Sequence, residues 1–238
     1  MKLTVFIACF NEKPTILKVI EEARALKVDK EIIVVDNCST DGTREILRPL
    51  ANDNVLRVFI HEKNMGVGYS ASEGISLARG EYFYAPCADL EYKTDDVYKM
   101  IEKLEKENLD AVFGSRLLER KGVPVLKLVK ERPYWLGSII STVLINLFYK
   151  RDFTDIIATK LIKTDILKGL GCEANNQAFE FELVSRLCKK GCRIGEVPVW
   201  YKPRTHKEGK TIRALDMIPA LWAILKIKFL LKRKIRNE

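Results

Sequence analysis

The chain has 238 residues, of which 47% are hydrophobic and 31% are charged. This balance excludes a disordered or multi-spanning protein, and the length suits one principal α/β domain with a sizeable core. Its 41 Lys and Arg residues exceed its 32 Asp and Glu residues, so the net charge is +9. Phosphates or an anionic membrane surface are therefore plausible partners, and charge alone does not exclude nucleic acid.

The first residues and the spacing of the cysteines indicate the cellular compartment in which we expect the protein. The apolar run near Leu3–Ala8 is too short for a signal peptide, so we expect a cytoplasmic protein. No paired CxxC spacing is present, which argues against a zinc ribbon or a secreted disulfide framework. We interpret most of the cysteines as small core residues.

Strands and helices alternate through the first half of the chain. The predicted strands are Leu3–Ala8, Glu31–Asp36, Val55–Ile60, Glu81–Ala85 and Asp110–Phe113. The predicted helices between them are Pro14–Leu26, Thr43–Leu50, Tyr69–Ala78 and Asp96–Glu107. This alternation predicts an α/β fold with a Rossmann-like, doubly wound, mainly parallel sheet and helices on both faces.

The second half is less regular. Pro133–Tyr149 carries no charge, Phe179–Lys190 has the pattern of an amphipathic helix, Cys192–Tyr201 is strand-like, and Lys202–Thr211 is a charged loop. We expect a catalytic domain over residues 1–211 and a C-terminal amphipathic, basic helix within residues 212–238.

Two apolar segments raise the question of membrane contact. Pro133–Tyr149 is short of a bilayer span and contains hydroxyl and amide side chains. Ile218–Leu231 includes two lysines and is followed by further basic residues, which fits a helix lying on the cytoplasmic face of a membrane. Both segments could instead pack against the catalytic domain.

Polar residues follow the predicted strands. The segments are Cys9–Glu12, Asp36, Asn64–Gly68 and Cys87–Asp89. The carboxyl ends of parallel strands open into a shared crevice, so we expect the Asp36 carboxylate there, accepting from a base imide or a ribose hydroxyl. Asp41 could simply cap the following helix. The GxGxxG of a dinucleotide site does not follow the first strand.

Several motifs occur in the order found in family-2 glycosyltransferases of the GT-A fold. They are Ala8–Glu12, Asp36–Thr43, Asn64–Gly66, Ala88–Leu90, Gly114–Arg116 and Glu196–Pro198. The chain most resembles the dolichol-phosphate mannosyltransferase-like branch, from the first strand to about Lys210.

The resemblance implies an inverting transfer from a GDP- or UDP-linked sugar to a polyprenyl phosphate at a membrane surface, with no nucleic-acid partner. It implies Mg²⁺ or Mn²⁺ on Asp89, and Asp89, Arg116 and Arg204 as catalytic residues. The implied donor-binding residues are Ala8, Phe10, Glu12, Asp36, Asn64, Gly66 and Ala88. The basic residues expected at the acceptor phosphate are Arg116, Arg132, Arg204 and Lys210.

The chain departs from the family's pattern at two positions. Cys87 occupies the first position of the usual DxD, and Asn37 replaces the second acid of DDxS. A thiol is a poor ligand for Mg²⁺ or Mn²⁺, so we expect Glu91, two residues after Asp89, to serve as a second metal ligand. Alternatively, Glu91 is a solvated loop acid and metal binding is weakened.

The acceptor decides which mechanism is needed. A polyprenyl phosphate is already an anion and can attack without a general base. A sugar hydroxyl would need a carboxylate base, for which Glu180 and Glu182 are candidates on one predicted helix. A glycan or other hydroxyl acceptor, or a donor-binding protein without turnover, are the alternative functions.

Overall fold

The structure, a computed structural model, describes residues 1–52, 54–132, 135–204 and 217–230. A seven-stranded sheet has the order β3-β2-β1-β4-β6-β5-β7, in which β6 runs antiparallel to both of its neighbours and the other pairs are parallel. The strands are β1 (Leu3–Cys9), β2 (Lys30–Asp36), β3 (Leu56–Ile60), β4 (Tyr82–Tyr84), β5 (Ala111–Ser115), β6 (Lys160–Lys163) and β7 (Ile194–Pro198). The predicted α/β class with a mainly parallel sheet is confirmed.

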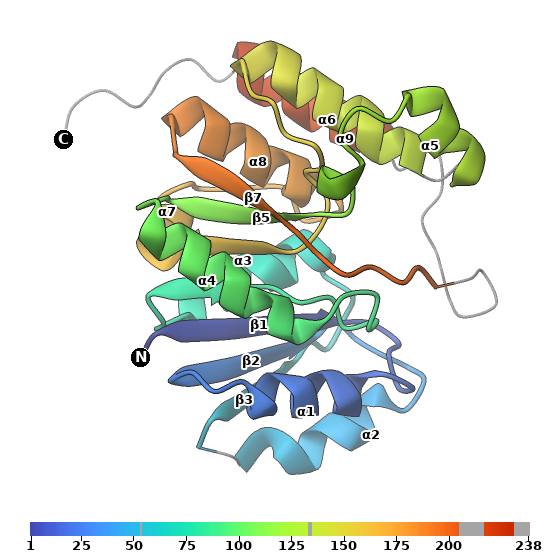
Figure 1. The fold of residues 1–238 in the computed structure, drawn as a ribbon. Helices are drawn as coiled ribbons and strands as arrows, with labels where there is room; N and C mark the ends of the chain where they lie inside the picture. Colours follow the sequence, from blue (N-terminus) through green and yellow to red (C-terminus); the bar gives the residue numbers. More distant parts are fainter. Residues whose placement is uncertain (53, 133–134, 205–216, 231–238) are drawn as a thin grey trace.

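Helices cover both faces of the sheet (Figure 1). The α-helices are α1 (Ile16–Ala25), α2 (Thr43–Leu47), α3 (Val67–Leu77), α4 (Val97–Lys106), α5 (Val125–Glu131), α6 (Trp135–Tyr149), α7 (Thr164–Lys168), α8 (Ala178–Lys190) and α9 (Met217–Leu225). Short 3-10 turns η1 (Arg48–Asn52), η2 (Thr94–Asp96) and η3 (Leu118–Arg120) and the π-helical turn η6 (Lys226–Leu230) complete the described elements.

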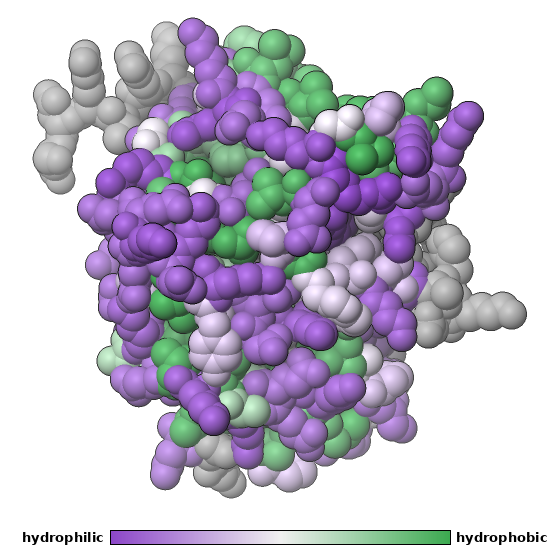
Figure 2. Space-filling view, viewed as in Figure 1, coloured by the Kyte–Doolittle hydropathy of each residue, from purple (hydrophilic) through white to green (hydrophobic). Residues whose placement is uncertain are grey.

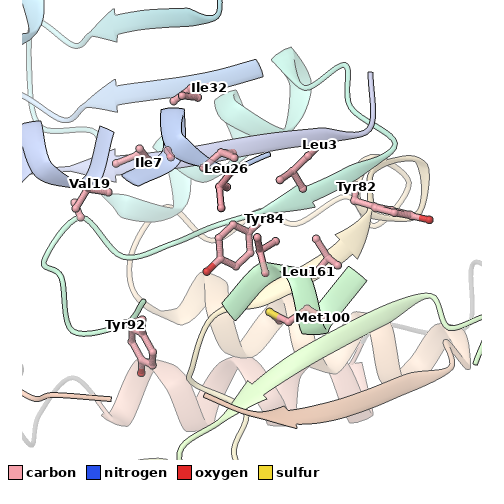
Figure 3. Packing of buried hydrophobic residues seen from close by; sticks show 14 of the residues in the cluster. Leu3, Ile7, Val19, Leu26, Ile32, Tyr82, Tyr84, Tyr92, Met100 and Leu161 are labelled. Atoms are coloured by element: carbon pink, nitrogen blue, oxygen red, sulfur yellow. The ribbon is translucent and has the colours of Figure 1, made fainter. Parts of the chain in front are cut away.

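Two cores lie on opposite faces of the sheet, because alternate side chains of each strand point to opposite sides. Leu3, Val5 and Ile7 of β1 pack with α1 and α4 in one core. Phe6 points the other way, into a core shared with α8 and α9. Figure 3 shows the first core, where Tyr84 and Met100 lie between the sheet and α4.

The structure differs from the prediction at several elements, among them α5 and α7, which were not predicted. The helix predicted at Thr43–Leu50 ends at Leu47 and continues as η1, whose Pro49 cannot donate an intrahelical hydrogen bond. Strand β6 was not predicted, because two of its four residues are lysines and it has no alternating apolar pattern. Its buried Lys160 pairs with a carboxylate, which permits a charge inside the sheet.

The C-terminal helix packs against the domain. In α9 and η6, the side chains of Ala220, Ile224 and Ile227 are buried against α8 and α6. Residues 212–216 and the basic residues after 230 lie outside the described part. Among the described helices, none is both long and apolar enough to cross a bilayer.

Candidate functional site

A crevice of about 450 Å³ lies where β1, β2 and β4 end, as predicted for the carboxyl edge of a parallel sheet. We call it the polar crevice. Its lining residues are Ala8, Phe10, Glu12, Asn37, Asn64, Gly66, Val67, Cys87, Ala88, Asp89, Asn176 and Gln177. Six of the seven residues expected to bind the donor are thus brought together, and Asp36 is the exception.

The loops that form the crevice hold residues with unusual backbone angles. Asn11, Cys38 and Leu90 have φ values of 58°, 70° and 58°, in the left-handed region that most side chains avoid. Hydrogen bonds hold the loop after β1 in place. The Asn11 backbone N–H donates to Ser39 Oγ at 2.8 Å, and the Asn11 side-chain Oδ1 accepts from the Thr40 N–H at 2.8 Å. Backbone strain of this kind gathers at functional sites.

Asp41 joins the loop after β2 to the start of α2. Its Oδ1 accepts from the Thr43 N–H at 3.0 Å, and its Oδ2 accepts from the Lys13 N–H at 3.0 Å. The Thr43 Oγ1 accepts in turn from the Glu12 N–H at 3.0 Å. Asp41 therefore holds the turn before α2 but is not its N-cap, which is Gly42 and has no side-chain cap hydrogen bond.

Asp36 does not lie where we predicted. Its side chain is 0% exposed, and its Oδ2 accepts from the Ser39 N–H at 3.0 Å and from Arg44 Nε at 3.2 Å. A buried carboxylate needs such partners, and Arg44 of α2 supplies the counter-charge. The expectation that the Asp36 carboxylate points into the crevice is therefore wrong, and the next residue, Asn37, lines the crevice instead.

Asn37 organises a polar network at the crevice wall. Its Nδ2 donates to Asn64 Oδ1 at 2.9 Å, and its Oδ1 accepts from the Met65 N–H at 2.8 Å. His61 contacts Asn37 Oδ1 through Nδ1 at 3.2 Å and Glu73 through Nε2 at 2.8 Å. The family's second acid is thus replaced by an amide that both donates and accepts.

Gly66 lets the start of α3 approach the segment before α8. It has a φ of 90°, and a Cβ there would lie 2.1 Å from the backbone oxygen of Asn175. A Cβ on Gly68 would meet the Ala174 oxygen at the same distance. These glycines bring Asn176 and Gln177 to the crevice opposite the β1 loop.

Three carboxylates gather around Arg204. Its guanidinium donates to both oxygens of Glu12 at 2.9 Å each and to Asp89 Oδ2 at 3.3 Å, and its backbone N–H donates to Glu91 Oε1 at 2.7 Å. The Glu91 N–H also donates to Asp89 Oδ1 at 3.0 Å. The residues predicted at the metal and the donor therefore share one cation that belongs to the chain itself.

The electrostatics at this point favour a positive charge. Burial raises the pKa of Asp89, and the charges of Glu91 and Glu12 raise it further while Arg204 lowers it. Burial works against the charged form of Arg204, but its hydrogen bond to Glu12 and the charge of Asp89 raise its pKa overall. The cluster is strongly acidic without its arginine.

The oxygen ligands fit a divalent ion only in part. In the described residues, no group of three or more His, Cys, Asp and Glu side chains is arranged to hold a metal. Mg²⁺, however, is commonly held by one or two carboxylates plus substrate phosphates. Asp89 and Glu91 are two carboxylates that could serve in this way: Asp89 Oδ2 faces the Arg204 guanidinium, and Glu91 Oε1 accepts from the Arg204 backbone N–H.

Arg116 is not in the crevice lining. Its guanidinium donates from Nε and Nη2 to both oxygens of Asp155, at 2.6 and 2.9 Å, and from Nη2 to Ser138 Oγ at 2.9 Å. Asp155 is 0% exposed, and despite its burial the neighbouring Arg116 holds its pKa below the ordinary value. The arginine thus neutralises a buried carboxylate.

The other predicted basic residues are placed differently. The Arg132 guanidinium lies over the Trp135 ring, 5.2 Å from its centroid, at the junction of α5 and α6. Lys210 lies outside the described residues.

The structure separates the two glutamates on α8. Glu182 is buried and accepts from the Ala174 N–H at 2.9 Å and from Arg186 Nε at 2.7 Å. Glu180 is 35% exposed, pairs with the buried Lys160, and acts electrostatically on Cys87. Neither glutamate is among the residues that line the crevice, and Glu180 is the less buried of the two.

Besides Asn37, the lining residues Asn176 and Gln177 were not predicted from the sequence. Asn176 and Gln177 precede α8 and follow no parallel strand, so the rule that places functional residues at strand ends did not apply to them. The polar run before an amphipathic helix was the available signal.

Solved structures with a similar fold are GT-A glycosyltransferases. One is S. aureus TarS 1–349 in complex with UDP-GlcNAc, at a TM-score of 0.63 and 19% identity, covering 95% of this chain and 66% of that one. Another is glucosyl-3-phosphoglycerate synthase from Mycobacterium tuberculosis in complex with Mn²⁺, UDP-glucose and phosphoglyceric acid. Its TM-score is 0.68 at 16% identity, and the match covers 95% of this chain and 79% of that one. The fold class is therefore GT-A.

The family model described as Glycosyl transferase family 2 matches residues 4–171, and the chain belongs to this family. An uncharacterized protein of Methanocaldococcus jannaschii, MJ0544, is 30% identical over 82% of this chain and 85% of its own length. The low-salt glycan biosynthesis hexosyltransferase Agl6 of Haloferax volcanii is 26% identical over 92% of this chain. The chain spans about half of Agl6, or 51% of its length.

Proposed function

We propose that the chain transfers a sugar from a nucleotide-sugar to a polyprenyl phosphate, with inversion at the anomeric carbon. The observation that carries the proposal is the convergence of Glu12, Asp89, Glu91 and Arg204 at the edge of the polar crevice. It joins the residues expected at the nucleoside, the metal and the phosphates, which come from distant parts of the chain.

The crevice offers the contacts that a nucleoside diphosphate requires. Phe10 is 47% exposed and presents a ring on which a base can stack. The amides of Asn37 and Asn64 offer donors and acceptors to the base or the ribose. We assign the hydrogen-bonding role expected of Asp36 to Asn37, because the Asp36 carboxylate is buried and already bonded to the Ser39 N–H and Arg44.

Arg204 is the residue proposed to change partners during the reaction. Donor binding brings a diphosphate next to Asp89, and repulsion between these anions favours the movement of Arg204 from Glu12 onto the phosphate oxygens. The guanidinium then neutralises charge that develops on the leaving diphosphate. Arg116 supports the site indirectly, by fixing the backbone after β5 through Asp155.

A divalent ion would be held by Asp89 and Glu91 together with the donor's phosphates. When bound, Mg²⁺ or Mn²⁺ would add positive charge at the leaving group. The acceptor phosphate is an anion at neutral pH, so the chain's remaining task is to hold it in line with the anomeric carbon. Arg132, at the junction of α5 and α6, is proposed for that contact.

The test is a transfer assay with radiolabelled GDP- and UDP-sugars and a polyprenyl phosphate, with Mn²⁺ or with EDTA. We expect labelled lipid from one donor class, and a loss of at least about 100-fold in Arg204→Ala, which removes the charge that stabilises the leaving group. Arg193→Ala, at an exposed ion pair with Asp110 away from the crevice, is the matched control. Transfer to an oligosaccharide but not to the lipid would overturn the proposed acceptor.

A hydroxyl acceptor is the second candidate, and Glu180 favours it. This carboxylate is 35% exposed and pairs with Lys160, whereas Glu182 is buried against Arg186, so of the two Glu180 is the one that could turn toward an acceptor. If the acceptor is a hydroxyl, Glu180→Gln should abolish transfer because the general base is lost. With a phosphate acceptor, the same variant should keep most of its activity.

A further inference from the structure

Two helices lie side by side at the end of the molecule beyond β7 (Figure 1). The continuous segment α9–η6 packs against α8 and α6, with the Phe148 and Phe229 rings 5.6 Å apart. Lys228 Nζ donates to the carbonyl oxygen of Phe148. These contacts fix the two helices to each other and leave one side of each facing outward.

The outward sides carry two matching apolar stripes. In both, successive residues are four, three and four positions apart, which places them on one face of a helix. We call this surface the outer apolar face. Its residues are Leu136, Ile140, Val143 and Leu147 of α6, and Ile218, Trp222, Leu225 and Phe229 of α9–η6, each between 38% and 70% exposed.

A contiguous apolar surface of this kind is uncommon on a monomeric soluble protein. Figure 2 shows hydrophobic residues gathered along the edge of the molecule where α6 and α9 lie. The inner sides of the same helices bury Ile139, Ile145 and Ile224, so the fold already has its core without the outer residues. Stability of the domain therefore does not explain the outer stripes.

Basic residues border the outer apolar face. On α5, Lys127 and Lys130 line a groove of about 540 Å³ together with Leu126, whose side chain is 67% exposed, and Glu131, whose charge is paired with Arg120. Exposed Lys150 follows the C-terminus of α6. Neither α6 nor α9–η6 contains an Asp or Glu.

We infer that the outer apolar face binds a bilayer surface that contains anionic lipids. Its apolar stripes would enter the boundary between headgroups and acyl chains, while the lysines contact lipid phosphates. A second copy of the chain fits this face less well, because dimerisation would bring two basic borders and two +9 chains together. The inference does not rest on the proposed sugar transfer, since it concerns a surface outside the polar crevice.

The test is co-sedimentation of the full chain with vesicles, without any sugar donor. Binding to phosphatidylcholine vesicles that contain phosphatidylglycerol is expected, and it should weaken with salt. The double variant Leu147→Ser/Trp222→Ser should bind these vesicles at least about tenfold more weakly, because it removes two large apolar side chains. The matched control Leu17→Ser/Val55→Ser changes exposed apolar residues elsewhere and should bind like the unaltered chain.

The contribution of charge is tested separately. Lys127→Glu/Lys130→Glu should lower binding to vesicles with phosphatidylglycerol and leave binding to phosphatidylcholine alone almost unchanged. Unchanged binding to both kinds of vesicle would overturn the role of the basic border. Far-ultraviolet circular dichroism of every variant checks that the fold is retained.

Two further measurements separate the bilayer from other occupants. Trp222 fluorescence, obtained as the difference from Trp222→Phe, should shift to the blue on vesicle addition because the indole leaves water. Absence of binding, or equal binding by Leu147→Ser/Trp222→Ser, would overturn the inference. A stable dimer in sedimentation velocity that this variant dissociates would assign the face to a second copy instead.

Discussion

At the level of single residues, Asp89 allows the sharpest prediction. Its charge is proposed to be needed for sugar transfer, and the same buried charge destabilises the fold. Its pKa is raised above 3.8 chiefly by burial. An acid with a higher pKa folded than unfolded holds its proton more tightly in the folded state, so its ionisation opposes folding as pH rises. At pH 7, Asp89→Asn should therefore raise the thermal midpoint while lowering transfer at least about 100-fold.

The pH dependence of melting checks the origin of this effect. The stabilisation by Asp89→Asn should be large at pH 7 and shrink as pH falls through the raised pKa, where Asp89 is protonated anyway. Asp95→Asn, at an exposed acid on η2, is the control and should change neither activity nor melting. A lower melting temperature for Asp89→Asn at pH 7 would contradict the argument.

The buried pair of Arg116 and Asp155 predicts the reverse dependence. The pKa of Asp155 is depressed, so its contribution to stability is present above 3.8 and is lost as pH falls through the folded pKa. Asp155→Asn leaves the Arg116 charge buried and should cost about 3–5 kcal/mol in urea unfolding at pH 7. Glu131→Gln, in the exposed pair with Arg120, should cost about 1 kcal/mol or less.

Individual residues also mark how far the sequence could predict the site. Strand ends located most of the polar crevice, because parallel strands bring their carboxyl ends to one edge. The position of a strand end does not predict that Asp36 points to Arg44 and Asn37 into the crevice. That difference depends on where α2 places Arg44, which is a tertiary contact. The contact between Arg204 and Glu12 joins residues 192 positions apart, which no local spacing predicts.

Among the elements, the approach of α3 to the loop before α8 depends on Gly66. With Gly66→Ala, the new Cβ would clash with the Asn175 oxygen, so the crevice wall must move. Gly122→Ala is a matched control, because Gly122 also has a positive φ, 93°, but has nothing within 4 Å of its would-be Cβ. Both variants carry backbone strain of about 1 kcal/mol, and only Gly66→Ala should also weaken donor binding by about tenfold or more.

Isothermal titration with UDP or GDP, whichever the chain binds, measures the difference. Equal affinities for Gly66→Ala and Gly122→Ala would show that the α3 contact does not shape the crevice.

The elements themselves were predicted well where hydrophobic periodicity is strong. Strands β1 and β2 and helix α4 fall within a few residues of their predicted bounds. Strand β6 escaped prediction because its stability comes from its neighbours β4 and β5 and from the pairing of Lys160 with Glu180. Both are tertiary contacts, which a local pattern does not contain.

At the scale of the whole molecule, the structure shows where the C-terminal helix α9 lies: it packs against α8 and α6. The sequence left open whether this helix lies on a membrane or packs on the domain. The two alternatives prove compatible in geometry, because Ile224 faces the core and Trp222 faces outward. We therefore predict that α9 unfolds together with the sheet.

Ile224→Ala tests this prediction, because Ile224 is 0% exposed and belongs to the core shared with α8. The cavity should cost about 2–5 kcal/mol and leave a single transition by circular dichroism and by tryptophan fluorescence. Ile218→Ala, on the same helix but 65% exposed, should cost much less. If α9 were only an appendage, Ile224→Ala would melt the helix alone and leave the main transition of the sheet at its original midpoint.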